Sequence, residues 1–434
     1  MNFLIKQCLN KFIKNDFIKG ASILASGTVI SQVIPFLIAP IISRLYLPTD
    51  YALLASYSAI TTVITILATG MYDSALMLDK KDEDAINTAS IALFITSGVT
   101  FITLLSILFL KSLNLSQVND IGNWIYIIPI TVFFQGGYQT LNFWNNRKSR
   151  YNRLANNKII TSTLTSVITI SLGYYHFHEK GLLVSLIVGQ ITSFLILFIQ
   201  TYKQDKHLIS HVSKIQLIHS LKTHKDFPIY NLPQGFLDSI KESSLVWIIS
   251  FYFGTTALGS FSFAKSILMR PLQIISGAVS QVFYQRASKQ YFETGDILSI
   301  SKKTFLTLFF IGFPFALIMY FFGKNIFVLI FGNEWELAGY FSEILIFWLF
   351  ITFISSPLGS IPIILKKQKT FFKWSIFYNV MPLIMLYFIS KKYLVLKFSI
   401  IGFSITNILI MTMILIWIKN IISQTQKLII SNND

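Results

Sequence analysis

The chain has 434 residues, of which 53% are hydrophobic and only 13% are charged. A soluble domain carries about 25% charged residues, so this composition excludes an ordinary soluble protein. The net charge is +17, and because basic residues alternate with apolar runs, we attribute it to membrane topology rather than to nucleic-acid binding. The single cysteine, Cys8, excludes an intrachain disulfide and a cysteine-based metal site.

The N-terminal residues 1–19 predict an amphipathic helix on the membrane surface. Apolar residues recur there at helical spacing opposite lysines: Leu4, Ile5, Cys8, Leu9, Phe12 and Ile13 against Lys6, Lys11 and Lys14. The lysines also interrupt any apolar core of a signal peptide. A solvated tail is the alternative interpretation.

Apolar runs of about twenty residues, separated by short polar segments, predict transmembrane helices and an all-α membrane protein. We predict twelve spans: 20–43, 51–77, 85–110, 121–145, 157–176, 181–202, 227–253, 258–285, 303–323, 340–364, 371–390 and 398–418. Of the 36 Lys and Arg residues, 26 lie in segments on the N-terminal side of the membrane and 7 on the other side. The positive-inside rule therefore predicts that both termini are cytoplasmic.

The longest predicted cytoplasmic connection, 203–226, divides the spans into two lobes of six helices, 20–202 and 227–418, followed by a cytoplasmic tail, 419–434. Similar segments follow the first and seventh spans, "RLYLPTDYALLASYSA" and "SFYFGTTALGSFSFAK". Six spans per lobe give the lobes the same orientation, as in parallel-repeat transporters, so we expect a pseudo-two-fold relation. In the linker, Leu208, Val212, Ile215 and Ile218 recur at helical spacing, which favours a second helix on the membrane surface.

Motifs for enzymatic or metal chemistry are poor. The acidic run "DED" at 82–84 resembles a glycosyltransferase metal motif, but it lies in a loop without a soluble domain to hold a nucleotide sugar. His207 and His211 have a spacing that a metal could use, but no third ligand is evident. Surface side chains are the better interpretation of both, and no phosphate-binding glycine loop or GxSxG elbow occurs.

The charges deepest in the predicted membrane fall on the seventh and eighth spans. They are Asp238, Lys241 and Glu242 on the seventh, and Lys265 and Arg270 on the eighth. Lys241 and Arg270 each lie about 18 Å from the outer loop near 254–258 at the α-helical rise. The two groups of charges therefore share one level of the bilayer.

Both spans carry a polar stripe at helical spacing. The stripes are Asn231, Gly235, Asp238 and Glu242, and then Ser262, Ser266, Arg270, Gln273, Gly277 and Ser280. Such a stripe faces protein or water rather than lipid. A buried ion pair between packed helices and a polar cavity wall are both compatible with it; the many small and amide residues favour the cavity.

Five stretches resemble the bacterial polysaccharide flippases. They are "MYDSALMLDKKDEDAINTASIAL" (71–93), "NFWNNRKSRYNRLANNKII" (142–160), "FPIYNLPQGFL" (227–237), "SILMRPLQIISGAVSQVFYQRAS" (266–288) and "IFGNEWELAG" (330–339). These match the O-antigen flippases (Wzx-type) of the multidrug/oligosaccharidyl-lipid/polysaccharide exporter superfamily in order from the second to the tenth span.

The resemblance implies twelve helices in a two-lobed, V-shaped transporter of the bacterial inner membrane, with helices one, two, seven and eight lining a central cavity. It implies that the protein transfers an undecaprenyl-pyrophosphate-linked oligosaccharide, an O-antigen or capsule repeat unit, from the cytoplasmic to the periplasmic leaflet by alternating access. Lys265 stands where the family commonly has a basic residue before "L-x-x-P", here Leu268–Pro271. The role of Arg270 rests on the stripe alone.

We therefore expect a transporter rather than an enzyme. Arg270, Lys265 and Lys241 are the candidate pyrophosphate ligands, because cations in a low-dielectric cavity attract a concentrated anion. Candidate sugar-binding residues are Asn231, Gln234, Ser262, Ser266 and Gln273. Candidate coupling or ion-pairing carboxylates are Asp238, Glu242 and Asp73. We expect one of the first two to pair with Arg270 or Lys265 when substrate is absent.

No cofactor is expected beyond a coupling ion, H⁺ or Na⁺. The expected partners are the lipid-linked oligosaccharide, the bilayer and other membrane proteins of polysaccharide assembly. Two alternatives remain open: a cation-coupled drug exporter built on Asp238 and Glu242, and an O-antigen polymerase. The polymerase is disfavoured because such enzymes carry a large outer loop, whereas the longest outer connection here is 324–339.

Overall fold

The computed structural model describes residues 16–112, 122–294 and 297–431. Within these ranges the chain is built from helices and turns and contains no β-strand, which confirms the all-α prediction. The predicted N-terminal amphipathic helix lies outside the described residues, except for its last residues, which begin α2 (Asp16–Leu37).

The elements up to residue 223 are α2 (Asp16–Leu37), α3 (Ala39–Leu45), α4 (Pro48–Ala68), α5 (Tyr72–Ala75), α6 (Asp82–Ser112), η2 (Gly122–Ile127), α7 (Ile128–Arg147), α8 (Tyr151–Tyr174), α9 (His178–Asp205), η3 (Lys206–His211) and α10 (Lys214–Thr223). Those that follow are η4 (Phe227–Asn231), α11 (Leu232–Thr294), α12 (Leu298–Phe331), η5 (Asn333–Trp335), α13 (Glu336–Leu358), α14 (Ile361–Ile364), α15 (Gln368–Tyr393) and α16 (Leu396–Ser431).

Gly254 divides α11 into two helices. Its φ of 80° and ψ of 179° leave the helical region, a conformation that only glycine adopts without strain. With α11 counted as two, twelve helices of at least 20 residues stand in the described ranges, one for each predicted span. Eight helices there, or nine with the bent pair α2 and α3, pass a length and hydropathy test for membrane spans. The protein is therefore a multi-pass membrane protein.

The first two spans differ from the prediction at their ends. The first is broken between α2 and α3, which meet at 41°, because Pro40 at the start of α3 lacks the N–H that would continue the helix. The second ends at Ala68 rather than at residue 77. Gly70 and Met71, with φ of 58° and 61°, form a left-handed step before the single turn of α5.

The chain forms two compact units. The first comprises the residues up to Tyr46 together with Leu53–Ser243, and the second comprises Leu47–Ala52 together with the residues from Ser244. Helices α4 and α11 thus contribute to both units. The predicted lobe boundaries, the pseudo-two-fold relation, the V shape and the central cavity stay predictions.

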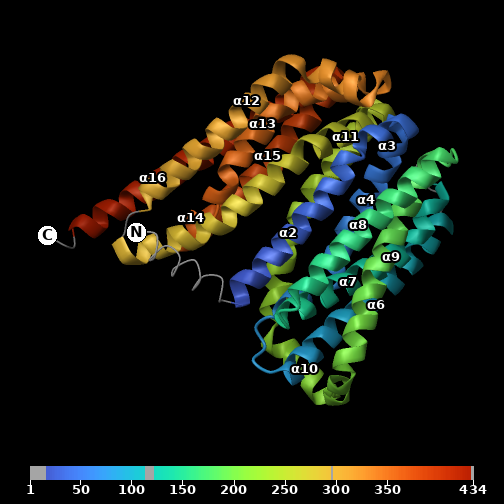
Figure 1. The fold of residues 1–434 in the computed structure, drawn as a ribbon, viewed down its shortest axis with the longest axis vertical. Helices are drawn as coiled ribbons and strands as arrows, with labels where there is room; N and C mark the ends of the chain where they lie inside the picture. Colours follow the sequence, from blue (N-terminus) through green and yellow to red (C-terminus); the bar gives the residue numbers. More distant parts are fainter. Residues whose placement is uncertain (1–15, 113–121, 295–296, 432–434) are drawn as a thin grey trace, which may run out of the picture. The chain divides into compact units, whose positions relative to one another are not determined.

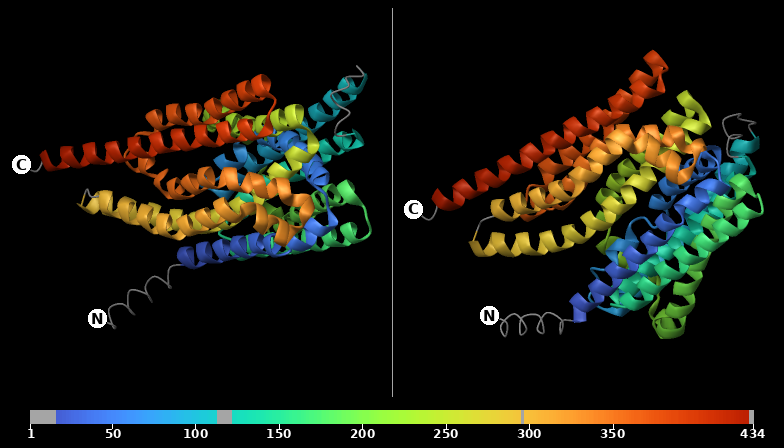
Figure 2. Two further views of the ribbon diagram at one scale, coloured as in Figure 1. Left: turned by 90° about the horizontal axis from the view of Figure 1, so that it is seen from above. Right: turned by 45° about the horizontal axis from the view of Figure 1, so that its top comes forward.

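In the first unit, α2 packs along α8, α8 along α9, and α7 along α6 and α9 (Figures 1 and 2). Gly27 allows the close approach of α2 to α8, since a Cβ there would lie 2.5 Å from the Cβ of Ala155. Further along the pair, the Ser162 hydroxyl donates to the Ser31 carbonyl at 2.6 Å. The order of these contacts shows that α2 and α8 run parallel.

In the second unit, α12 packs along α13, α13 along α16, and α15 along α16. The rings of Tyr51, Phe263 and Trp335 meet one another at centroid distances of 4.0 to 5.2 Å. Next to them, a Cβ at Gly259 would lie 1.6 Å from the carbonyl oxygen of Pro48. Glycine at this position therefore lets α11 contact the first turn of α4 directly.

Candidate functional site

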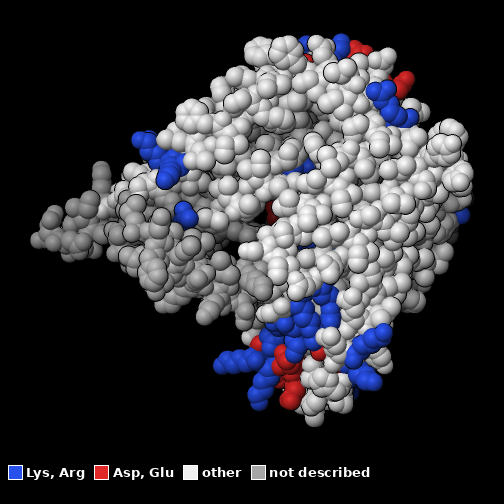
Figure 3. Space-filling model, viewed as in Figure 1, with Lys and Arg blue, Asp and Glu red and all other residues white. Residues whose placement is uncertain are grey.

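Charged side chains gather at the end of the first unit where α10 lies, whereas the visible flank of its helices is largely free of charge (Figure 3). This end carries the connections between α4 and α6, α7 and α8, and α9 and α11. A charged rim beside an uncharged flank is the distribution expected of a protein whose helices cross a bilayer.

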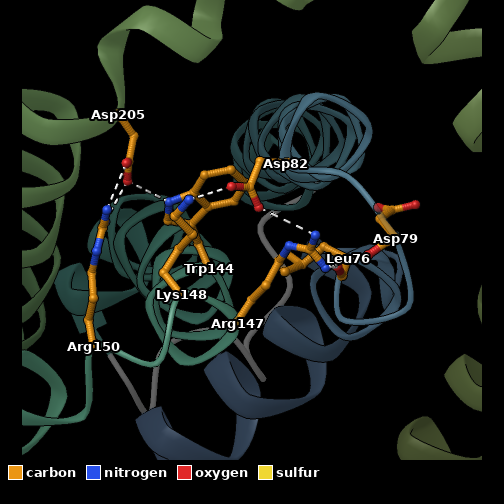
Figure 4. A network of polar contacts seen from close by, with 8 residues as sticks. All are labelled: Leu76, Asp79, Asp82, Trp144, Arg147, Lys148, Arg150 and Asp205. Atoms are coloured by element: carbon orange, nitrogen blue, oxygen red, sulfur yellow. Dashed lines mark hydrogen bonds and ion pairs between the residues drawn. The ribbon is translucent and has the colours of Figure 1, made fainter.

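At this rim, Asp82 accepts hydrogen bonds from Lys148 and Arg147 (Figure 4). Arg147 also donates to the carbonyl oxygens of Leu76, at 3.2 Å, and Asp79. One guanidinium thus fixes the connection 76–82 to the end of α7. Arginine suits this position because its donors point in several fixed directions.

The second ion pair of the rim joins α7, α8 and α9 (Figure 4). Asp205, at the end of α9, accepts two hydrogen bonds from Arg150, one of them at 2.7 Å, and a third from the Trp144 indole at 2.8 Å. The Asp205 side chain is only 7% exposed. Because these bonds are short and buried, we assign the pair to holding the three helix ends together.

The predicted linker 203–226 is docked onto the first unit. Asn87 of α6 donates to the carbonyl of His211 at 3.2 Å and accepts from the N–H of Ser213 at 3.3 Å. His224 forms a buried hydrogen bond with Asp79 at 2.8 Å. These contacts make the linker part of the first unit rather than a free connection.

The apolar residues of the linker do not form one continuous face. Leu208 lies in η3 and is buried in the core of the first unit, whereas Ile215 and Ile218 are exposed on α10. The position of α10 on the membrane surface stays a prediction. His211 lies 3.7 Å from Glu83, and the described residues contain no group of three or more His, Cys, Asp or Glu side chains suited to a metal.

Asp73 is buried on α5, beyond the end of α4. It is 3% exposed and accepts a hydrogen bond from the Thr69 hydroxyl at 2.9 Å. Burial raises the pKa of the Asp73 carboxyl above its usual range, although the hydrogen bond from Thr69 partly offsets the shift. The left-handed step at Gly70 and Met71 places this carboxyl in the connection rather than in the membrane span.

The first part of α11 belongs to the first unit. Asn231, the last residue of η4, is exposed, as are Gln234, Asp238 and Glu242 of α11, whereas Lys241 is buried. This segment is bound to α4 by a hydrogen bond of 2.8 Å from the Ser243 hydroxyl to the Ala59 carbonyl. Asn231, Asp238 and Glu242 belong to the predicted polar stripe, and Gln234 lies next to it. Their assignment to substrate binding or coupling stays a prediction.

The second part of α11 belongs to the second unit. Ser262, Lys265, Ser266 and Arg270 are half-buried, and Gln273 is exposed. The ammonium nitrogen of Lys265 lies 5.8 Å from the centroid of the Trp348 ring on α13. A cation at this distance from an indole face is attracted by the ring quadrupole.

Lys158 stands at the start of the predicted fifth span and was not predicted as a candidate site residue. The fifth span was predicted to begin at 157, whereas α8 begins at Tyr151, so Lys158 lies about 10 Å into the helix. Its ammonium donates to the Thr28 hydroxyl of α2 at 2.9 Å. Because the residues before it, "NNRKSRYNRLANN", are polar, the hydrophobic pattern does not indicate where this helix begins.

A family model described as polysaccharide biosynthesis protein matches residues 41–338. The chain belongs to this family. Among the curated proteins, none matches the sequence.

Solved structures show which fold this polysaccharide biosynthesis protein adopts. It is similar to the lipid II flippase MurJ in an inward closed conformation, with a TM-score of 0.69 and 15% identity over 91% of this chain and 87% of that chain. It is also similar to a multidrug resistance MATE family transporter of the MOP superfamily in an inward-facing conformation, with a TM-score of 0.62 and 14% identity over 92% and 96% of the two chains. At such low identity the likeness establishes the fold, and the family match confirms that the chain belongs to a polysaccharide biosynthesis family, as the resemblance implied.

Proposed function

We propose that this polysaccharide biosynthesis protein transfers an undecaprenyl-pyrophosphate-linked oligosaccharide from the cytoplasmic to the periplasmic leaflet of the bacterial inner membrane by alternating access. The substrate is an O-antigen or capsule repeat unit, and both termini are cytoplasmic. The observation that carries the proposal is the concentration of cationic, hydroxyl and amide side chains on α11, in a member of this family with a transporter fold.

In this proposal the cations of α11 bind the pyrophosphate. Arg270, Lys265 and Lys241 lie on a membrane helix, where charge is costly unless a partner compensates it. A pyrophosphate provides concentrated negative charge and several acceptor oxygens. The Trp348 ring is a neighbour of Lys265, and the face of an indole attracts an ammonium group.

The sugar and the lipid tail need different surroundings. Hydroxyl and amide groups can exchange hydrogen bonds with a glycan, and the candidates on η4 and α11 are Asn231, Gln234, Ser262, Ser266 and Gln273. The polyprenyl tail stays in the hydrocarbon of the bilayer throughout, so only the head group needs a polar path across it. This division explains why a polar stripe suffices without a sealed polar channel.

Three carboxylates are candidates for coupling transport to H⁺ or Na⁺. Asp238 and Glu242 share a face of α11, and pairing of either with Arg270 or Lys265 would lower the cost of those cations until pyrophosphate displaces it. Replacing them by Asn and Gln should alter the pH dependence of transport if either carries the proton. An unchanged pH profile in both variants would exclude them, and Asp73 would then be the remaining candidate.

The proposed function is tested by replacing the α11 cations in cells that depend on this protein for surface polysaccharide. Arg270→Ala and Lys265→Ala should abolish the surface polysaccharide while the protein remains in the membrane at a normal level. Lys111→Ala is a matched control, because Lys111 lies at the end of α6 beside the Tyr126 ring, remote in sequence from α11. Normal export by both α11 variants would contradict the proposal.

A cation-coupled drug exporter is the second candidate, supported by the likeness to MATE family transporters and by Asp238 and Glu242. It predicts export of organic cations, and resistance to them, in cells that carry the protein. For an O-antigen polymerase, the enzyme alternative, these comparisons give no support, since the similar structures are described as a flippase and multidrug transporters.

A further inference from the structure

Lys158 lies on α8, the helix of the fifth predicted span, and its ammonium contacts a neutral hydroxyl. It is half-buried, and its Nζ donates to the Oγ1 of Thr28 on α2 at 2.9 Å. The Thr28 hydroxyl in turn donates to the carbonyl of Leu24 at 2.8 Å, so its lone pair is directed to the ammonium. An ammonium has three N–H donors, and this contact occupies one.

Among the residues whose side chains are described, no carboxylate forms an ion pair with this ammonium. Lys158 is the second residue of the predicted span 157–176 and lies about 10 Å from the start of α8. A half-buried ammonium without a carboxylate partner is costly, and an anionic ligand would compensate its charge. The remaining donors of Lys158 can therefore serve an anionic ligand.

The packing of α2 on α8 does not need this lysine. Gly27 against Ala155 and the Ser162 hydrogen bond to Ser31 lie on either side of the contact. Further along, the Tyr46 hydroxyl donates to the carbonyl of Thr169 at 2.8 Å. Since the Gly27 contact and the hydroxyl-to-carbonyl hydrogen bonds already fix the two helices in register, the packing does not depend on the Lys158 ammonium.

We propose that Lys158 is an anion-binding residue of the first unit, which contacts a phosphate of the polyprenyl pyrophosphate during its transfer. This inference rests on the proposed function and deepens it. A lysine suits this role because it acts as a compact charge on a flexible stem and can follow a phosphate that moves.

The test measures binding of undecaprenyl pyrophosphate to the purified full-length protein by native mass spectrometry. Lys158→Met keeps the length of the side chain and removes the charge, and it should weaken binding about tenfold, as loss of one charged hydrogen bond predicts. Lys158→Arg should retain most of the affinity. If the Met variant does not accumulate, Lys158→Gln replaces it.

Thr28→Val is the matched control for a structural role. It removes the hydroxyl partner but keeps the lysine charge, so binding should stay within about twofold of wild type, which is less than one hydrogen bond. If Thr28→Val reproduces the loss seen in Lys158→Met, the lysine serves packing and the inference is overturned. Undiminished binding by Lys158→Met overturns it as well.

The same experiment separates this inference from the proposed function. If wild-type protein binds undecaprenyl pyrophosphate and Arg270→Ala weakens the binding while Lys158→Met does not, only the role of Lys158 fails. If wild-type protein does not bind this lipid, the proposed function fails, and the role of Lys158 fails with it.

Discussion

The cations at the helix ends of the first unit differ from the cation inside α8. Lys148 and Arg150 contact the carboxylates of Asp82 and Asp205, whereas Lys158, two turns further along, contacts a threonine hydroxyl. All three belong to one basic segment of the sequence. The difference teaches that the partner, rather than the charge itself, separates cations that hold helices together from cations available to a substrate.

The largest expected effect comes from removing the buried carboxylate of Asp205. Asp205→Ala leaves the Arg150 guanidinium and the Trp144 indole without their acceptor in a place where the carboxylate is 7% exposed. Breaking such a buried pair costs about 3–5 kcal/mol, so we expect a large fall in the thermal unfolding temperature in detergent. If stability were unchanged and transport were lost, the rim would be part of the transport path.

Removing the lysine of α8 should have the opposite effect, a loss of transport without a loss of stability. Lys158→Met should reduce transport about tenfold, the equivalent of one charged hydrogen bond, and leave the unfolding temperature unchanged or raised, since it deletes an uncompensated charge. Transport and unfolding measured on the same preparation check both parts. A fall in stability matching that of Asp205→Ala would erase the distinction between the two kinds of cation.

Asp73 extends the comparison to a carboxylate, because its side chain is buried beside a hydroxyl rather than a cation. Burial raises the pKa of the Asp73 carboxyl, so the folded protein holds this proton to a higher pH than the unfolded chain does. The stability it contributes is present at low pH and is lost as pH rises through the folded pKa. Asp73→Asn should remove this trend, so its stability relative to wild type should increase with pH; a constant difference would contradict the shift.

The smallest effect is expected at the exposed end of the rim. Lys148 and Asp82 are 23% and 38% exposed, and surface pairs of this kind contribute about 1 kcal/mol or less. Lys148→Met should therefore lower the unfolding temperature only slightly and leave transport intact. A loss of transport equal to that of Lys158→Met would show that the whole basic segment, rather than one lysine, handles the substrate.

Much of the fold could be predicted from the sequence, because most of the apolar runs are long enough to cross a bilayer by themselves. The ends of the spans were harder. The polar segment before Lys158 is helical, and the residues after Ala68 form a left-handed step. Such features depend on packing, for example on the fit of Gly27 against Ala155. The local amino-acid composition does not predict such contacts.

The candidate site could be predicted only in part. The stripe on α11 follows from helical spacing within one segment, so its residues are readable in the sequence. The pairing of Arg150 with Asp205 joins positions 55 residues apart, and the contact of Lys158 with Thr28 spans 130. Neither segment carries a signal for the other, so those assignments needed the structure.

The most direct test of the central claim is transfer of the lipid-linked oligosaccharide itself. Purified protein is reconstituted into liposomes that contain undecaprenyl-pyrophosphate-linked oligosaccharide, and a membrane-impermeant lectin measures how much glycan is exposed on the outer leaflet over time. The account predicts that wild-type protein moves glycan between leaflets, that Arg270→Ala slows this transfer about tenfold or more, and that Lys111→Ala does not. Wild-type liposomes that behave like protein-free liposomes, while the same preparation transports an organic cation, would contradict it.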